Sequence, residues 1–83
     1  MAIYIQMKKV YEDNKTVIYE YGMNESVTGK IGYEKSNKQI LDIEPLIING
    51  EKKDYLFHKS AQKLVVTAHE ENNTFPDKLI IAS

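Results

Sequence analysis

The sequence predicts one α+β domain spanning residues 1–83, a mainly antiparallel sheet of four to five strands with one helix near the C-terminal end. The first half alternates apolar and polar residues with a period of two and is rich in β-branched and aromatic side chains. From Asp54 the apolar spacing becomes helical, and a short apolar run follows the helix. Eighty-three residues are enough for one hydrophobic core and too few for two.

The first two predicted strands form a hairpin. In the first strand Ile3, Ile5 and Met7 alternate with Tyr4, Gln6 and Lys8. The polar cluster at residues 12–15 predicts a turn. In the second strand, one face is expected to carry Val17, Tyr19, Tyr21 and Met23. Tyr19 and Tyr21 are therefore expected in the core, and Tyr4 at the surface.

The next two predicted strands cover residues 28–35 and 39–44. The first should place Ile31 and Tyr33 on one face. Gly29 and Gly32 weaken it, which indicates a bulge or a close approach of backbone. Pro45 ends or edges the second.

The apolar run at residues 46–48 is closed by Asn49-Gly50, a strong turn dipeptide. The run forms either a short strand of its own or part of a loop that leads to the helix. The helix is predicted from Asp54 to about Glu71, with one apolar stripe made of Phe57, Ala61, Leu64, Val65 and Ala68. The run at residues 79–82 predicts a last strand beside the earlier ones.

Composition argues against several function classes. The absence of cysteine excludes disulfides, thiolate metal sites and cysteine nucleophiles. The net charge is −1 and every basic residue is a lysine, so nucleic-acid binding is not expected. No apolar run approaches the roughly 20 residues that cross a bilayer, and the N-terminus does not read as a signal peptide. We expect a cytoplasmic protein without a membrane partner.

The two histidines do not predict a metal site. His58 and His69 lie eleven positions apart on the predicted helix, roughly 16 Å along its axis at 1.5 Å per residue. One ion cannot bind both, so we expect ordinary helix-surface residues and neither a metal nor a cofactor.

Carboxylates and tyrosines provide the candidate binding residues. Some strand carboxylates are expected on the sheet face away from the helix, where a catalytic acid and base could also pair. A solvated face is the simpler interpretation, because no nucleophile elbow, phosphate loop or dinucleotide motif is present. Exposed tyrosines beside these acids would suit a basic, partly apolar partner. The candidate partner-binding residues are Tyr4, Glu20, Glu34, Asp42 and Glu44.

The chain also resembles a family. Its segments Val17-Ile-Tyr-Glu-Tyr-Gly22, Lys30-Ile-Gly-Tyr33 and Phe75-Pro-Asp-Lys-Leu-Ile-Ile-Ala82, with Ala61 and Lys63-Leu64 in the helix, resemble small immunity proteins of bacterial polymorphic and contact-dependent toxin systems. The resemblance is one of general texture over most of the chain, so it carries over no individual binding residue. It implies a cytosolic, noncatalytic protein that neutralises one cognate toxin by direct binding.

The expected function is therefore noncatalytic protein binding, with a cognate toxin domain as the partner. One alternative is a structural or regulatory module that forms a homo-oligomer through an edge strand, because an open sheet leaves its edges unpaired. The other is a small enzyme that uses the strand carboxylates.

Overall fold

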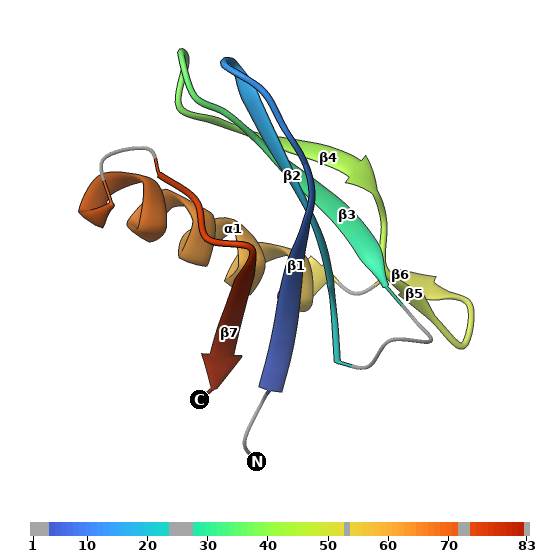
Figure 1. Ribbon diagram of the computed structural model, residues 1–83. Helices are drawn as coiled ribbons and strands as arrows, with labels where there is room; N and C mark the ends of the chain where they lie inside the picture. The colour runs from blue at the N-terminus through green and yellow to red at the C-terminus, as the bar shows by residue number, and fades with distance from the viewer. Residues whose placement is uncertain (1–3, 24–27, 53, 72–73, 83) are drawn as a thin grey trace.

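The computed structural model describes residues 4–23, 28–52, 54–71 and 74–82, and it shows an antiparallel sheet with one helix on one face (Figure 1). The main sheet contains β1 (Tyr4–Glu12), β2 (Thr16–Gly22), β3 (Gly29–Glu34), β4 (Gln39–Glu44) and β7 (Lys78–Ala82). Helix α1 spans Asp54–Glu70, and a separate hairpin pairs β5 (Ile47–Ile48) with β6 (Glu51–Lys52). The order in the main sheet is β4-β3-β2-β1-β7. The predicted α+β fold, with five sheet strands and a helix near the C-terminal end, is confirmed.

The turn between β1 and β2 is stabilised by Asp13. Its Oδ1 accepts hydrogen bonds from the backbone N–H groups of Lys15 and Thr16, at 2.8 and 2.7 Å. An aspartate that bonds to backbone N–H groups just ahead of it is a common way to close a turn. The predicted turn is thus confirmed.

Gly29 lies where two stretches of backbone come very close. A Cβ atom there would lie 2.7 Å from the Glu44 carbonyl oxygen and 2.8 Å from the Leu46 nitrogen. The register between β3 and β4 also shifts beside it, between Lys30 and Ile31. The expected close approach and the expected bulge both occur in this strand pair.

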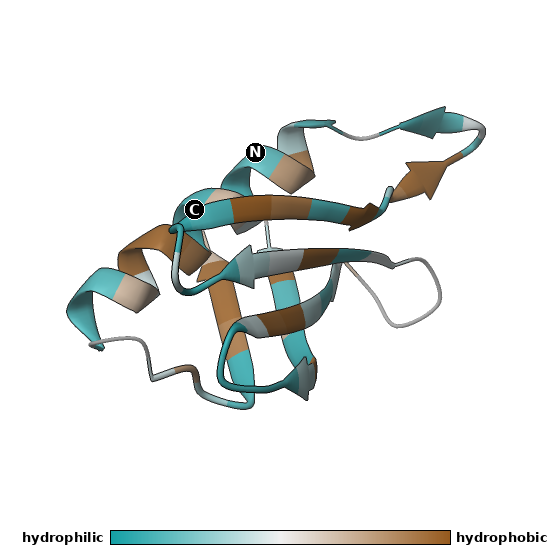
Figure 2. Cartoon of the chain, turned by 90° about the horizontal axis from the view of Figure 1, so that it is seen from above, coloured by the Kyte–Doolittle hydropathy of each residue, from teal (hydrophilic) through white to brown (hydrophobic). Residues whose placement is uncertain are grey.

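The β5-β6 hairpin turns at Asn49 and Gly50, both of which have positive φ angles, 54° and 80°. Two successive positive φ angles are typical of the tight turns that join antiparallel strands. Figure 2 shows this hairpin, with an apolar β5 beside a polar β6. The run at residues 46–48 therefore contributes a short strand of its own, and β6 was not predicted.

The core lies between the sheet and α1. Tyr19, Tyr21, Ile31 and Tyr33 are almost fully buried, as their alternation predicted. The core consists of Ile5, Met7, Val17, Tyr19, Tyr21, Ile31, Tyr33, Leu46, Leu56, Leu64, Ala68, Phe75 and Leu79. Ile3 lies outside the described residues. The prediction for Met23 was wrong: it is 47% exposed, because β2 ends at Gly22, one residue before it.

The predicted helix stripe was partly right: Leu64 and Ala68 are buried, whereas its other three members are not. The buried residues of α1 are Leu56, Ser60, Leu64, Thr67 and Ala68. Val65 is 46% exposed, while Phe57 and Ala61 lie at the margin of the core. Adjacent helix positions differ by about 100°, so Phe57 and Ala61, each one residue after the buried Leu56 and Ser60, are turned to the margin of the buried face. The buried Ser60 and Thr67 are small and polar, so the spacing of hydrophobic residues does not identify them as buried.

In the part of the chain that the structure describes, no helix has the length and apolar character needed to span a membrane.

Candidate protein-binding face

The sheet has one face that α1 does not cover, which we call the open face. Directly opposite residues on neighbouring strands point to the same side of a sheet. The core residues Met7, Tyr21 and Ile31 are on the helix side. The open face therefore carries the alternate positions, among them Gln6, Lys8, Ile18, Glu20, Lys30, Gly32, Leu41 and Ile80.

A row of charged residues crosses the open face from one edge of the sheet to the other. We call it the charged row, and from β7 to β4 it consists of Lys78, Lys8, Glu20, Lys30 and Glu44. The Lys30 ammonium lies 3.3 Å from the Glu44 carboxylate. At the other end, Lys8 and Lys78 are directly opposite each other. Like charges in opposed positions repel, so the two lysines favour nearby negative groups, one of which is Glu20, opposite Lys8 on β2.

Next to the charged row is a row of apolar side chains, the apolar band, formed by Tyr11, Ile18, Leu41 and Ile43. Tyr11 pairs with Ile18, Gly32 pairs with both Ile18 and Leu41, and Ile43 lies over Gly32. Tyr11 is 50% exposed and Ile43 is 44% exposed. Apolar and aromatic side chains in a group on a polar surface are typical of protein interfaces.

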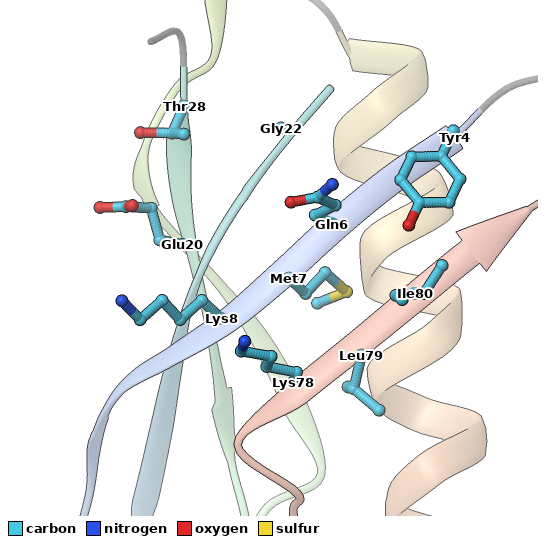
Figure 3. A pocket seen from close by; sticks show the side chains of 10 residues that line it. All are labelled: Tyr4, Gln6, Met7, Lys8, Glu20, Gly22, Thr28, Lys78, Leu79 and Ile80. Carbon is cyan, nitrogen blue, oxygen red and sulfur yellow. The ribbon is translucent and has the colours of Figure 1, made fainter. Parts of the chain in front are cut away.

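On the other side of the charged row, the open face is hollowed (Figure 3). The hollow has a volume of about 300 Å³. Gln6 and Ile80 are opposed on their strands, and Gly22, the partner of Gln6 on β2, has no side chain to fill the space. The lining residues are Tyr4, Gln6, Met7, Lys8, Glu20, Gly22, Thr28, Lys78, Leu79 and Ile80.

The structure brings together two of the five candidate binding residues. Tyr4 is 45% exposed, as expected, and lines the hollow with Glu20. Glu44 is on the same face at the β4 end of the charged row. Glu34 is opposite Thr16, beyond the apolar band, and accepts hydrogen bonds from Ser36 and Asn37.

Asp42 does not belong to this face. It is opposite Ile31, a core residue, and is therefore on the helix side. Its carboxylate lies 3.4 Å from the Lys52 ammonium in β6. The bulge between β3 and β4 gives Asp42 and Glu44 opposite orientations, although they are two residues apart.

Sequence reasoning emphasised the acids and missed the lysines of the charged row and most of the apolar band. Lys8 and Lys78 were not connected, because 70 positions separate them and only the β1-β7 register makes them neighbours. The alternation in β2 did place Ile18 and Glu20 on the face opposite Tyr19. The alternation in β1 likewise placed Tyr4, Gln6 and Lys8 on the face opposite Met7.

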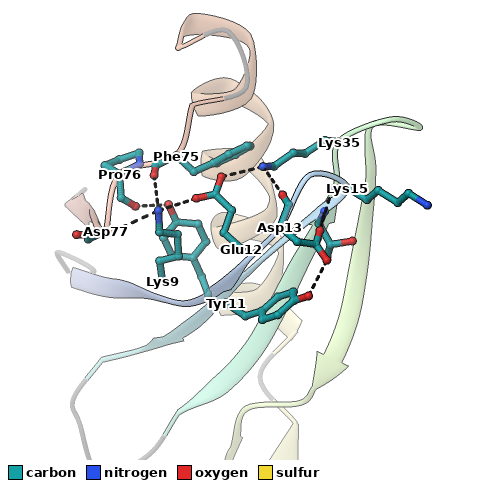
Figure 4. A network of polar contacts seen from close by, with 11 residues as sticks. Lys9, Tyr11, Glu12, Asp13, Lys15, Lys35, Phe75, Pro76 and Asp77 are labelled. Atoms are coloured by element: carbon teal, nitrogen blue, oxygen red, sulfur yellow. Dashed lines mark hydrogen bonds and ion pairs between the residues drawn. The ribbon is translucent and has the colours of Figure 1, made fainter.

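A second polar cluster lies at the other end of β1 (Figure 4). The Glu12 carboxylate is between the ammonium groups of Lys9 and Lys35, at 2.7 and 2.8 Å. Lys35 also donates to the Asp13 carbonyl oxygen, and Lys9 donates to the Phe75 carbonyl oxygen. Hydrogen bonds from Lys35 and then Lys9 lower the pKa of Glu12 below its ordinary value of 4.5. The cluster joins β1 to the β3-β4 turn and to the segment before β7, which points to a structural role.

Within the described residues, no three or more histidine, aspartate and glutamate side chains gather in a way that could hold a metal ion. His58 and His69 are both exposed on α1.

The chain was compared with protein-family models, with curated proteins and with solved structures, and none of the three comparisons gives a match.

Proposed function

We propose that this chain is a noncatalytic protein-binding module that docks a single partner protein on its open face. The observation that carries the proposal is the apolar band, whose exposed Tyr11 and Ile43 lie beside the charged row on the sheet face opposite α1. Aromatic and apolar anchors surrounded by polar groups are the usual composition of a binding hot spot.

The charges of the open face indicate the chemistry of the partner. The opposed Lys8 and Lys78 would be stabilised by an acidic group of the partner above them. Glu34, beyond the apolar band, would instead face a basic group. The partner surface is therefore apolar at its centre with acidic and basic groups on opposite sides, which refines the basic partner expected from the acids alone.

We further propose that the partner is a toxin domain and that binding neutralises it in the cytoplasm. This identification rests on the resemblance of the chain to small bacterial immunity proteins. A binding protein of this kind needs an exposed surface complementary to its partner, and the apolar band beside the charged row is such a surface.

The arrangement of the carboxylates favours binding over catalysis. The strand carboxylates that could form an acid-base pair are Glu20, Glu34, Asp42 and Glu44, and of these only Glu20 lines the hollow. Asp42 is on the helix side of the sheet, and Glu44 is paired with Lys30.

The first test is to co-purify the tagged chain with the product of the gene immediately upstream, and then to measure affinity by calorimetry. A stoichiometric complex whose formation inhibits the partner's toxic activity is expected. A chain that binds no neighbouring gene product would contradict the toxin proposal.

The binding face is tested with two matched substitutions. Ile43→Asp introduces a charge into the apolar band, while Val65→Asp introduces one on the exposed side of α1, and the two residues are 44% and 46% exposed. We expect Ile43→Asp to weaken binding by about 2 kcal/mol or more, as for a hot-spot residue, and Val65→Asp to leave it nearly unchanged. The reverse result would place the binding surface on the helix.

A further inference from the structure

Strand β7 ends the main sheet, so among the described residues no strand pairs with its outer edge, and the hydrogen-bonding groups of that edge can be assigned. Figure 1 shows β7 beside β1 at the end of the sheet. The Lys9 N–H donates to the Asp77 carbonyl oxygen at 2.8 Å, and the same register continues through Met7 and Leu79. Bonded and non-bonded pairs alternate in an antiparallel ladder. Lys78, Ile80 and Ala82 therefore point their N–H and C=O groups away from β1.

The two edges of the sheet differ in their protection. Edge strands are usually shielded from pairing by charges, bulges or proline. The β4 edge has all three, in Asp42 and Glu44, the bulge opposite Lys30 and Ile31, and the following Pro45. In β7 the four residues after Lys78 are all apolar, the register with β1 is regular, and Ile80 is 52% exposed.

We propose that β7 pairs antiparallel with β7 of a second copy of this chain, with Ile80 opposite Ile80 on the twofold axis. In this register Lys78 of each copy is opposite Ala82 of the other copy. All three pairs join outward-pointing residues, so each can exchange two N–H···O bonds. Placing Leu79 or Ile81 on the axis instead leaves only two such pairs, and placing Lys78 on the axis brings the two lysines opposite each other.

The surroundings of the β7 edge on the helix side also support pairing with a second copy of this chain. A hollow of about 330 Å³ is bounded by the last turns of α1, the segment after the helix and Leu79. In the proposed register, Ile81 of the second copy is opposite Leu79 and points to this side. Opposed side chains in a non-bonded pair approach closely. Ile81 of the second copy would therefore pack on Leu79 beside Lys63 and Thr67, which line the hollow.

Pairing would also extend the open face. A twofold axis perpendicular to the sheet keeps both open faces on the same side. Ile80 lines the hollow that contains Tyr4, so the hollows of the two copies would adjoin at the axis. This inference does not rest on the proposed toxin partner.

The test is the mass of the purified chain in solution, measured by light scattering over a range of concentrations. We expect twice the mass of the chain for the wild type and a single-chain mass for Ile80→Lys, which sets two lysines opposite each other on the axis. Val65→Lys, on the exposed side of α1 and outside the hollow beside Leu79, is the matched control and should stay dimeric. Circular dichroism of each variant checks that the fold is retained.

Mixing Ile80→Lys with Ile80→Glu tests the register itself. Only a register that pairs position 80 with itself places the new lysine opposite the new glutamate, so we expect the mixture to recover the dimer. A wild type that stays monomeric up to millimolar concentration overturns the proposal, as does a dimer that Ile80→Lys leaves intact. A wild-type monomer that adds a strand of another protein at β7 would also overturn it. None of these results depends on whether a toxin partner binds.

Discussion

The Tyr19 hydroxyl connects the centre of the sheet to the segment before β7. The residue is fully buried, and its hydroxyl donates a hydrogen bond to the Pro76 carbonyl oxygen. Burial, followed by the nearby charges of Glu12 and Asp77, raises the pKa of Tyr19. The phenol therefore stays protonated and acts as a donor throughout the neutral range.

Tyr19→Phe is expected to lower the free energy of unfolding by about 1 kcal/mol, because the Pro76 carbonyl oxygen loses its donor. Chemical denaturation measures the change. Tyr11→Phe is the control: Tyr11 donates to Asp13 but is 50% exposed, so water can replace that bond. Equal losses in the two variants would contradict a special role for the Tyr19 bond.

Unlike Tyr19, Ser60 has a buried hydroxyl that makes no hydrogen bond with the described residues. It is fully buried in α1, and its Oγ has no hydrogen-bond partner among the described residues. Ser60→Ala removes the unpaired group and introduces the best helix former, so we expect a gain of about 1 kcal/mol in unfolding free energy. Thermal denaturation beside the exposed control Gln62→Ala is the measurement. A loss of stability would mean that the hydroxyl makes a contact that matters.

At the scale of the strand, Gly29 and Gly32 occur in the same element with different surroundings. A Cβ at position 29 would meet backbone atoms of Glu44 and Leu46, which cannot move without displacing the chain after β4. At position 32 the nearest atom is the terminal Cδ1 of Ile43, at 2.9 Å, on a side chain that is 44% exposed. Backbone atoms cannot move aside for an added methyl group as easily as the end of a flexible side chain can.

Gly29→Ala is therefore expected to destabilise the fold by about 1–3 kcal/mol, as other overpacking changes do. Gly32→Ala should change stability much less, because Ile43 can rotate toward solvent. Urea denaturation of both variants tests this difference. A larger loss for Gly32→Ala would show that the apolar band is held rigidly against β3.

At the scale of the whole molecule, the Glu12 cluster links three segments that are distant in sequence. The folded protein lowers the pKa of Glu12 through its two lysine partners, relative to the unfolded value near 4.5. The carboxylate therefore contributes stability above that value, and the contribution disappears as the pH falls through the lower folded pKa.

Glu12→Gln should lower the unfolding free energy at neutral pH by about 1 kcal/mol, a small value because the side chain is 28% exposed and solvent screens the pair. Below pH 4.5 the wild type should lose this advantage and approach the variant. Denaturation at a series of pH values measures both curves. A constant difference down to low pH would assign the effect of the substitution to packing.

The sequence predicted much of the fold because local patterns govern those parts. Alternation placed Tyr19, Tyr21 and Ile31 in the core, and Asn49-Gly50 marked a tight turn. The helix stripe was only partly predicted, because the buried Ser60 and Thr67 are polar residues and the apolar Val65 is exposed. Asp42 was grouped with Glu44 because the bulge that separates their orientations depends on the partner strand.

By itself, the sequence determined the class of fold, the strands of the main sheet, the helix, and the absence of cysteine and arginine chemistry. These follow from residue periodicity and residue type, which act over a few positions. Only the tertiary structure decided that Lys8 faces Lys78 and that β7 ends the sheet. Those features join residues that are distant in sequence, so they arise only once strand order and register are set.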